Sequence, residues 1–244
     1  MNTVLTDEYT VKNRDVGFDS LFKPSAVLEL FEDLVSVNSK DIGIDIETVR
    51  SYGIKWIITK IIVKMEKTPR LGEKLVVSTW PKKPGAIKCL RYFTAKSCGG
   101  ESLIDISSVW CVLGIDDDKI LRASEVKMPA DAVFSEEEAE VSGIPRPAPA
   151  LDGKLLFDYE FSYGDIDINR HVNNIAYLRL AENAFSFKEL EKKRIVGFET
   201  DFLAQSFEGD KALVYRRDDG NVVYVSILVS GKEVFRCSFL LKDI

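Results

Sequence analysis

The sequence predicts an α+β fold made of two tandem copies of one unit, in which a long helix packs against an antiparallel sheet. Two observations predict this fold. A segment near the N-terminus is repeated without gaps in the second half of the chain. In each half, one apolar pattern of helical spacing also precedes a series of short strand patterns. A helix followed by an antiparallel meander, twice over, is an α+β arrangement.

The internal repeat aligns Glu8–Asp33 with Asp158–Asn183, 150 positions later, without an insertion. A repeat of this length indicates duplication of a structural unit. Six aligned pairs are identical: Tyr9 and Tyr159, Asp15 and Asp165, Ala26 and Ala176, Leu28 and Leu178, Leu30 and Leu180, Glu32 and Glu182.

Each copy is expected to open with a short strand, Glu8–Val11 or Asp158–Phe161, followed by a loop and a helix. In the first copy Pro24 suits the first helical turn, because its ring fixes φ and no helical amide is lost. In the second copy Asn173 or Asn174 is expected to cap the helix. The apolar positions of that second helix are Ile175, Leu178 and Phe185.

Four strands are expected after each helix, separated by turns rich in Gly and Asp. A single apolar helix wrapped by a curved sheet is the hotdog arrangement, so the prediction is a double hotdog. The expected strands are Ile54–Glu66, Lys74–Trp80, Lys88–Ser97, Leu103–Ile115, Ile195–Ser206, Lys211–Arg217, Asn221–Val229 and Lys232–Leu241.

The predicted domains are an N-terminal hotdog over residues 1–115 and a C-terminal hotdog over 151–244, joined by a linker over 116–150. The linker holds an acidic run and three prolines near its end. This composition favours an extended, solvated connection. We also expect some helix around Phe134–Glu140.

Charge and composition exclude several classes of protein. With 33 Lys and Arg against 39 Asp and Glu, the net charge is -6, which argues against nucleic acid as a partner. There is no apolar run long enough to insert in a membrane and no signal peptide, so a cytoplasmic location is expected. Four cysteines without a CxxC motif and a single histidine favour neither a metal site nor a bound cofactor.

One polar triplet distinguishes the two copies. The second copy carries Asp167, Asn169 and His171, whereas the first carries Gly17, Asp19 and Leu21 at the aligned positions. A triplet needed only for folding should occur in both halves. The difference predicts one active site per chain, in the C-terminal half.

The spacing of the triplet suits hydrolysis of a thioester. Alternate residues of an extended segment face the same side, so we expect the three side chains to point into one cleft. The helix start that follows offers unpaired amides to a carbonyl oxygen that gains negative charge. Asp167 would attack directly or activate water, Asn169 would orient a reactant, and His171 would assist proton transfer.

The segment YGDIDINRHVNNIAYLRLAEN closely resembles the catalytic segment of acyl-ACP thioesterases, the plant FatA/FatB-type enzymes and their bacterial relatives. GFDSLFKPSAVLELFED, KTPRLGEKLVVSTWP and SSVWCVL resemble the N-terminal hotdog of the same family. The resemblance implies hydrolysis of fatty acyl-acyl carrier protein to free fatty acid, with catalysis in the C-terminal half and chain-length specificity in the N-terminal half. A start so close to the first strand suits a bacterial enzyme.

The sequence departs from the family pattern at one position. Members commonly place an acidic residue on the strand after the second helix, and Gln205 aligns there. Gln205 is expected to orient water or substrate by hydrogen bonding, since an amide is neither an acid nor a base. Ser206 stands where plant enzymes carry a cysteine, so a cysteine nucleophile finds no support.

Two further groups of residues are candidates for binding. Val27, Leu30 and Phe31 on the first helix, with Trp56 on the next strand, are expected to contact the acyl chain. The densest basic cluster is expected to dock the acidic acyl carrier protein, and its members are Lys82, Lys83, Lys88 and Arg91.

Three other functions compete with this interpretation. They are an acyl-CoA thioesterase of the same fold, a hotdog dehydratase or hydratase, and a non-catalytic protein that binds acyl groups. The intact triplet argues against the last. The sequence leaves open the acyl chain length and the oligomeric state, for which a homodimer is one candidate.

Overall fold

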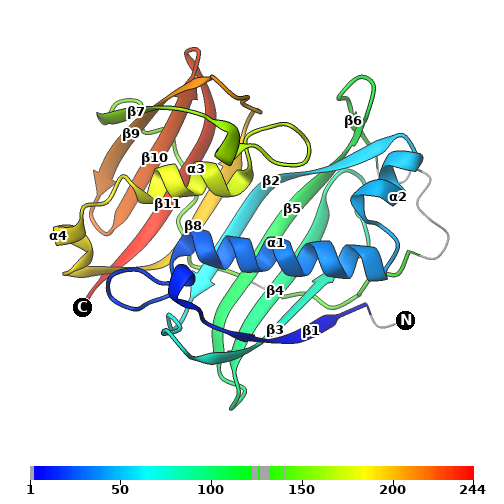
Figure 1. Cartoon of the computed structure of the whole chain (residues 1–244), viewed down its shortest axis with the longest axis horizontal. Coiled ribbons are helices and arrows are strands. Elements are labelled where there is room, and N and C mark those ends of the chain that lie inside the picture. The colour runs from blue at the N-terminus through cyan, green and yellow to red at the C-terminus, as the bar shows by residue number, and fades with distance from the viewer. Residues whose placement is uncertain (1–2, 123–125, 127–131, 140) are drawn as a thin grey trace.

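The computed structural model describes residues 3–122, 126, 132–139 and 141–244. Within these ranges the strands form one continuous 11-stranded antiparallel sheet (Figure 1). The N-terminal half contains β1 (Leu5–Thr10), α1 (Pro24–Asp41), α2 (Ile46–Ser51), β2 (Ile54–Met65), β3 (Lys74–Pro81), β4 (Cys89–Ser97), β5 (Ser102–Gly114) and β6 (Ile120–Leu121). The C-terminal half contains β7 (Lys154–Glu160), α3 (Asn174–Glu182), α4 (Phe187–Leu190), β8 (Lys193–Phe202), β9 (Lys211–Asp219), β10 (Val222–Val229) and β11 (Lys232–Asp243).

The sheet is two half-sheets joined edge to edge. Its order is β1-β3-β4-β5-β2-β8-β11-β10-β9-β7, and β6 pairs with β5. The seam is the antiparallel pair of β2 and β8, with Lys60 opposite Asp201 and Lys64 opposite Gly197. The Lys60 ammonium group bridges to Glu199 and, at 3.0 Å, to Asp201. Main-chain pairing and these charges together join the two halves into one sheet.

The two long helices lie on the same face of this sheet and contact each other (Figure 1). Arg179 of α3 donates to Glu29 of α1 over 2.5 Å. These two residues occupy equivalent positions in the repeat, which implies a pseudo-two-fold axis that passes between the helices. The predicted double hotdog is confirmed. None of the helices in the described ranges has the length and apolarity needed to cross a bilayer.

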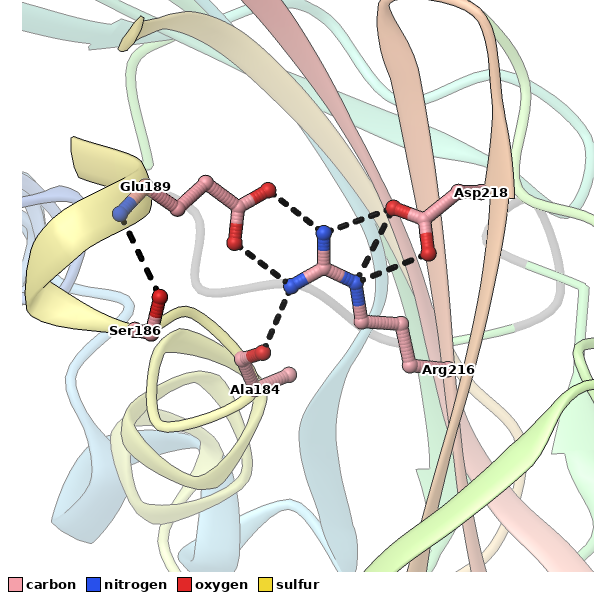
Figure 2. A network of polar contacts seen from close by, with 5 residues as sticks. All are labelled: Ala184, Ser186, Glu189, Arg216 and Asp218. Atoms are coloured by element: carbon pink, nitrogen blue, oxygen red, sulfur yellow. Dashed lines mark hydrogen bonds and ion pairs between the residues drawn. The ribbon is translucent and has the colours of Figure 1, made fainter. Parts of the chain in front are cut away.

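The helix of the second copy is shorter than expected. It ends at Glu182, so Phe185 lies beyond it, whereas α1 runs for 18 residues. Figure 2 shows the contacts that hold the chain after the end of α3. Arg216 of β9 donates to the Ala184 carbonyl over 2.7 Å and to both carboxylate oxygens of Glu189. A partly buried guanidinium group that pairs with Glu189 of α4 therefore satisfies the Ala184 carbonyl, which lies beyond the end of α3.

The linker differs from the prediction in two ways. Residues 132–139 are not helical, so the helix expected around Phe134–Glu140 is wrong over the described part, and Glu140 itself lies outside the described residues. Ser135 instead pairs with Lys82 as an isolated bridge. The linker is also only partly solvated, because the amide of Ala150 donates to Ser226 over 2.8 Å and Ser238 donates to the carbonyl of Pro145.

All ten predicted strands are present, the two that open the copies included, with ends that shift by a few residues. Among the α-helices and strands of the described residues, the sequence analysis did not predict three short ones: α2, α4 and β6. Each is too short to show a period, and α2 is defined mainly by Asp45, whose carboxylate caps the amides of Glu47 and Thr48.

Candidate active site

The polar triplet lies on a tight loop that both copies of the repeat share. Isolated bridges close the loop between Val16 and Phe22 in the first copy and between Ile166 and Val172 in the second. The amide of Gly17 donates to the Leu21 carbonyl over 2.9 Å, and in the second copy Asp167 donates to His171 over the same distance. Ser20 and Arg170 share a left-handed φ, 62° and 65°. The two copies therefore differ here in side chains and not in backbone.

The extended geometry expected for the triplet is wrong, because the segment turns back on itself. The turn nevertheless gathers polar groups around one carboxylate. Asp167 Oδ1 accepts from the amides of Asn169 at 2.7 Å and His171 at 3.3 Å, and Oδ2 accepts from Asn169 Nδ2 at 3.2 Å. Hydrogen bonds within the turn, and not strand alternation, hold the three residues together.

The loop leads directly into α3. Asn173 is the N-cap residue, and its side chain accepts from the Ile175 amide at 2.8 Å. The amide of Asn173 itself donates to the Asp165 carbonyl over 2.7 Å, which ties the helix start to the loop. The start of α3, which carries the partial positive charge of a helix N-terminus, is thus tied to the loop that holds Asp167.

The segment that holds Gln205 borders the same loop. The amide of Val172 donates to the Ser206 carbonyl over 2.9 Å, and the His171 ring meets Phe207 edge-on with centroids 5.2 Å apart. The Gln205 side chain is exposed, whereas Ser206 is buried. Within the described residues the buried hydroxyls of Ser206 and Tyr177 meet no hydrogen-bond partner in good geometry.

Two residues of the N-terminal half reach this site, and the sequence analysis missed both. Arg50 of α2 donates to Asn169 Oδ1 over 2.9 Å. Glu32 of α1 lies against Asn174, whose side chain hydrogen-bonds it, and faces the charge of Asp167. The identity of Glu32 and Glu182 in the repeat was a signal for the second residue, although it says nothing about contact across the halves.

A cavity of about 40 Å³ lies in the N-terminal half. Of the residues expected to bind the acyl chain, Trp56 lines this cavity, whereas Val27, Leu30 and Phe31 are packed in the core. Helix α1 contributes Val35 and Ser39 instead. The rest of the lining includes Cys89, Arg91, Trp110 and Phe134.

Arg91 was expected on a docking surface, and that expectation is wrong because its side chain is buried. It is 4% exposed and donates to Asn38 Oδ1 over 2.8 Å and to Ser39 Oγ over 3.2 Å. Burial lowers the pKa of Arg91 to about 9. Lys82 is half-buried and paired with Glu138, while Lys83 and Lys88 are exposed.

Comparison with known proteins identifies the family. The model of the acyl-ACP thioesterase N-terminal domain matches residues 2–127, and the model of the acyl-ACP thioesterase C-terminal domain matches residues 151–229. The fold and the matched domains define a double-hotdog protein of the thioesterase type. The chain belongs to the acyl-ACP thioesterase family.

Solved structures and curated relatives agree with this family. An acyl-ACP thioesterase from Bacteroides thetaiotaomicron superposes with a TM-score of 0.85 at 21% identity over 98% of both chains. The 12:0-ACP thioesterase from Umbellularia californica gives 0.80 at 17% identity, over 100% of this chain and 99% of that one. The acyl-[acyl-carrier-protein] hydrolase FATB2 of Cuphea viscosissima is 24% identical over 187 residues, 72% of this chain and 45% of the relative. The chain spans about half the length of the curated relatives it matches.

The burial of Arg91 leads to a prediction about stability. Arg91→Glu should lower the free energy of unfolding by about 3 kcal/mol or more, because a charged carboxylate would be buried against Asn38 Oδ1, which is itself an acceptor. Lys83→Glu makes the same change of charge at an exposed position and should cost less than about 0.5 kcal/mol. Urea denaturation of both variants measures the difference. Equal stability of the two would contradict the buried position.

Proposed function

We propose that the chain hydrolyses the thioester bond of fatty acyl-acyl carrier protein and releases free fatty acid and carrier protein. One observation carries the proposal: two loops of the same backbone geometry differ by a carboxylate, an amide and an imidazole that one of them carries beside a helix start. Family membership supports it, and the curated relatives are named as hydrolases or thioesterases of acyl carrier protein substrates.

The arrangement supplies what this reaction needs. Hydrolysis adds an oxygen to the acyl carbon, breaks the bond to sulfur and delivers a proton to the departing thiol. Asp167 acts either as the nucleophile or as the base that takes a proton from water. Its carboxylate is fixed by the amides of Asn169 and His171, which limits its motion. The amides at the start of α3 are suited to the oxyanion, and His171 to proton transfer.

We also propose that the two halves of the chain have different roles. Residues 1–115 bind the acyl chain, residues 116–150 connect, and residues 151–244 catalyse. Gln205 orients water or substrate from the segment beside the loop. The cytoplasmic location, the bacterial origin and the homodimer stay predictions.

Asp167→Asn tests the proposed chemistry. The change keeps the shape of the side chain and removes its basicity, so kcat on acyl-ACP should fall at least about 100-fold. Asp19→Asn is the matched control, because Asp19 sits on the equivalent loop of the first copy and its carboxylate accepts from the Leu21 amide. That variant should stay within about threefold of the wild type.

Release of free thiol from acyl-ACP and from acyl-CoA with the same acyl chain measures both variants. Equal losses in two folded variants would contradict a single site in the C-terminal half. Faster hydrolysis of the CoA substrate by the wild-type chain would contradict the carrier-protein assignment.

Docking of the carrier protein is proposed for the exposed lysines Lys83 and Lys88, which lie between β3 and β4. An overall negative chain needs a local positive patch to attract an acidic partner. Lys82 contributes less, because Glu138 already neutralises it.

Reversing both charges tests the docking proposal. The double variant Lys83→Glu, Lys88→Glu should lose about tenfold in kcat/KM on acyl-ACP at low salt, since rim charges act mainly on association. A small synthetic thioester should react as before. The double variant Lys232→Glu, Lys242→Glu changes two exposed lysines elsewhere and serves as the control. Similar losses on the small thioester would point to a structural defect.

The cavity is proposed to hold the distal part of the acyl chain. Along α1, Glu32 borders the site while Val35 and Ser39 line the cavity, on one helical face. At 1.5 Å per residue, Val35 lies roughly 4.5 Å further along the helix axis than Glu32. One helix thus runs from the reacting group towards the apolar end.

Val35→Phe should shorten the preferred chain, because the larger ring fills the cavity. The ratio of kcat/KM for long over short acyl-ACP should fall about tenfold, the scale of one or two methylenes in an apolar pocket. Val37→Phe, on the exposed side of the same helix, should leave the ratio unchanged. A chain-length profile of both variants decides. An unchanged profile in folded Val35→Phe would mean that the chain binds elsewhere.

A further inference from the structure

The helices of the two halves approach each other's N-termini, and one of these contacts is a cap. Glu182 of α3 accepts from the Ser25 amide in the first turn of α1 over 2.8 Å. The N-cap residue of α1 is Lys23, and within the described residues its side chain forms no cap. Glu182 therefore supplies from the opposite half the acceptor that this helix start lacks.

The equivalent contact in the other half has changed. Glu32 occupies the repeat position of Glu182, and Ile175 occupies that of Ser25. The Ile175 amide already donates to the Asn173 side chain over 2.8 Å, so the start of α3 has its own cap. Glu32 is therefore not needed as a cap for the start of α3.

The released carboxyl group lies at the candidate site. Its Oε1 atom is buried and has no hydrogen-bond partner among the described residues. The Asn174 side chain hydrogen-bonds the group, and the negative charge of Asp167 on the loop acts on it. A buried carboxyl group with an unpaired oxygen is costly in its charged form.

The charges around Glu32 come from three elements. Asp167 approaches from the loop, and Glu29 and Asp33 from α1 itself. Glu29 is paired with Arg179 of α3 over 2.5 Å, so this arginine offsets part of the repulsion. Burial is the largest cause that raises the pKa of Glu32, which reaches about 7, and the hydrogen bond from Asn174 opposes it.

We propose that Glu32 is a positioning residue of the C-terminal active site, which in its neutral form holds the Asn174 side chain at the start of α3 and leaves Asp167 as the negative charge beside it. The inference rests on the proposed function. Ionised Glu32 would place a second negative charge where the oxyanion develops, and so oppose the reaction.

The pH dependence follows from the direction of the shift. Glu32 is neutral below about pH 7 and charged above it. Activity that needs the neutral form is present at the lower pH and is lost as the pH rises. For one titrating group, kcat should fall about tenfold between roughly pH 6 and pH 8.

The experiment compares pH profiles of kcat on acyl-ACP. Glu32→Gln keeps the shape and removes the titration, so its profile should lose the limb near neutral pH. Glu32→Ala also removes the contact with Asn174 and should be at least about tenfold slower than Glu32→Gln at roughly pH 6. Glu182→Gln, at the equivalent position, keeps an acceptor for the Ser25 amide and should keep the wild-type limb. A limb that persists in Glu32→Gln, or equal rates of the alanine and glutamine variants, would overturn the inference.

A second measurement does not depend on turnover. The pKa of Glu32 is raised from its ordinary value of 4.5 to about 7 in the folded protein. Between these two pH values, Glu32 is protonated more in the folded state than in the unfolded state. The free energy of unfolding of the wild type should therefore fall with rising pH across this window, relative to Glu32→Gln, and the difference should stay constant above it. No difference in slope would overturn the neutral form of Glu32. A second outcome concerns the function itself. If the stability of the wild type falls in this pH range but the wild type hydrolyses no acyl thioester, the proposed function is wrong, and so is the role of Glu32 in its active site.

Discussion

The antiparallel pair of β2 and β8 is the contact on which the rest of the structure depends. It joins two half-sheets into one, and this fixes both helices on a single face, where Glu29 of α1 meets Arg179 of α3. Because these residues are equivalent in the repeat, each helix presents the same positions to the other. The N-terminus of each helix then lies beside an acidic residue of its partner, Glu182 in one case and Glu32 in the other.

This symmetry makes the candidate site a product of both halves. The loop with Asp167 belongs to the second copy, but Arg50 and Glu32 of the first copy complete its surroundings. Helix α1 of the N-terminal half carries Glu32 next to Asn174 and lines the cavity at Val35 and Ser39.

The sequence predicted the strands well because their alternation and turn residues are local signals. The cap at Asn173 and the start at Pro24 were predictable for the same reason. The early end of α3 was not, since it depends on Arg216, which meets Ala184 and Glu189 from a distant strand. The shape of the loop was mistaken for an extended segment because the left-handed Arg170 carries no glycine or asparagine signal.

Contacts between residues far apart in the sequence were the hardest to predict. Arg91 looks like a surface charge among three lysines, yet its neighbours Asn38 and Ser39 come from α1 and bury it. Glu32 and Glu182 are one of the six identical pairs of the repeat. These two glutamates have different surroundings although they are identical in the repeat. The difference arises because the Asn173 side chain caps α3, whereas the Lys23 side chain does not cap α1.

In a tandem chain the two helix starts can change independently, whereas in a symmetric dimer they cannot. In a dimer of identical units, one substitution changes both helix starts, so the acidic residue caps both helices or neither. In the fused chain, Asn173 replaces the aligned Lys23 in one copy alone. Glu182 accepts a hydrogen bond from the Ser25 amide at the start of α1. Glu32 is not needed as the cap of α3, and its buried carboxyl group lies in the field of Asp167. Duplication thus gives the two glutamates at this repeat position different surroundings.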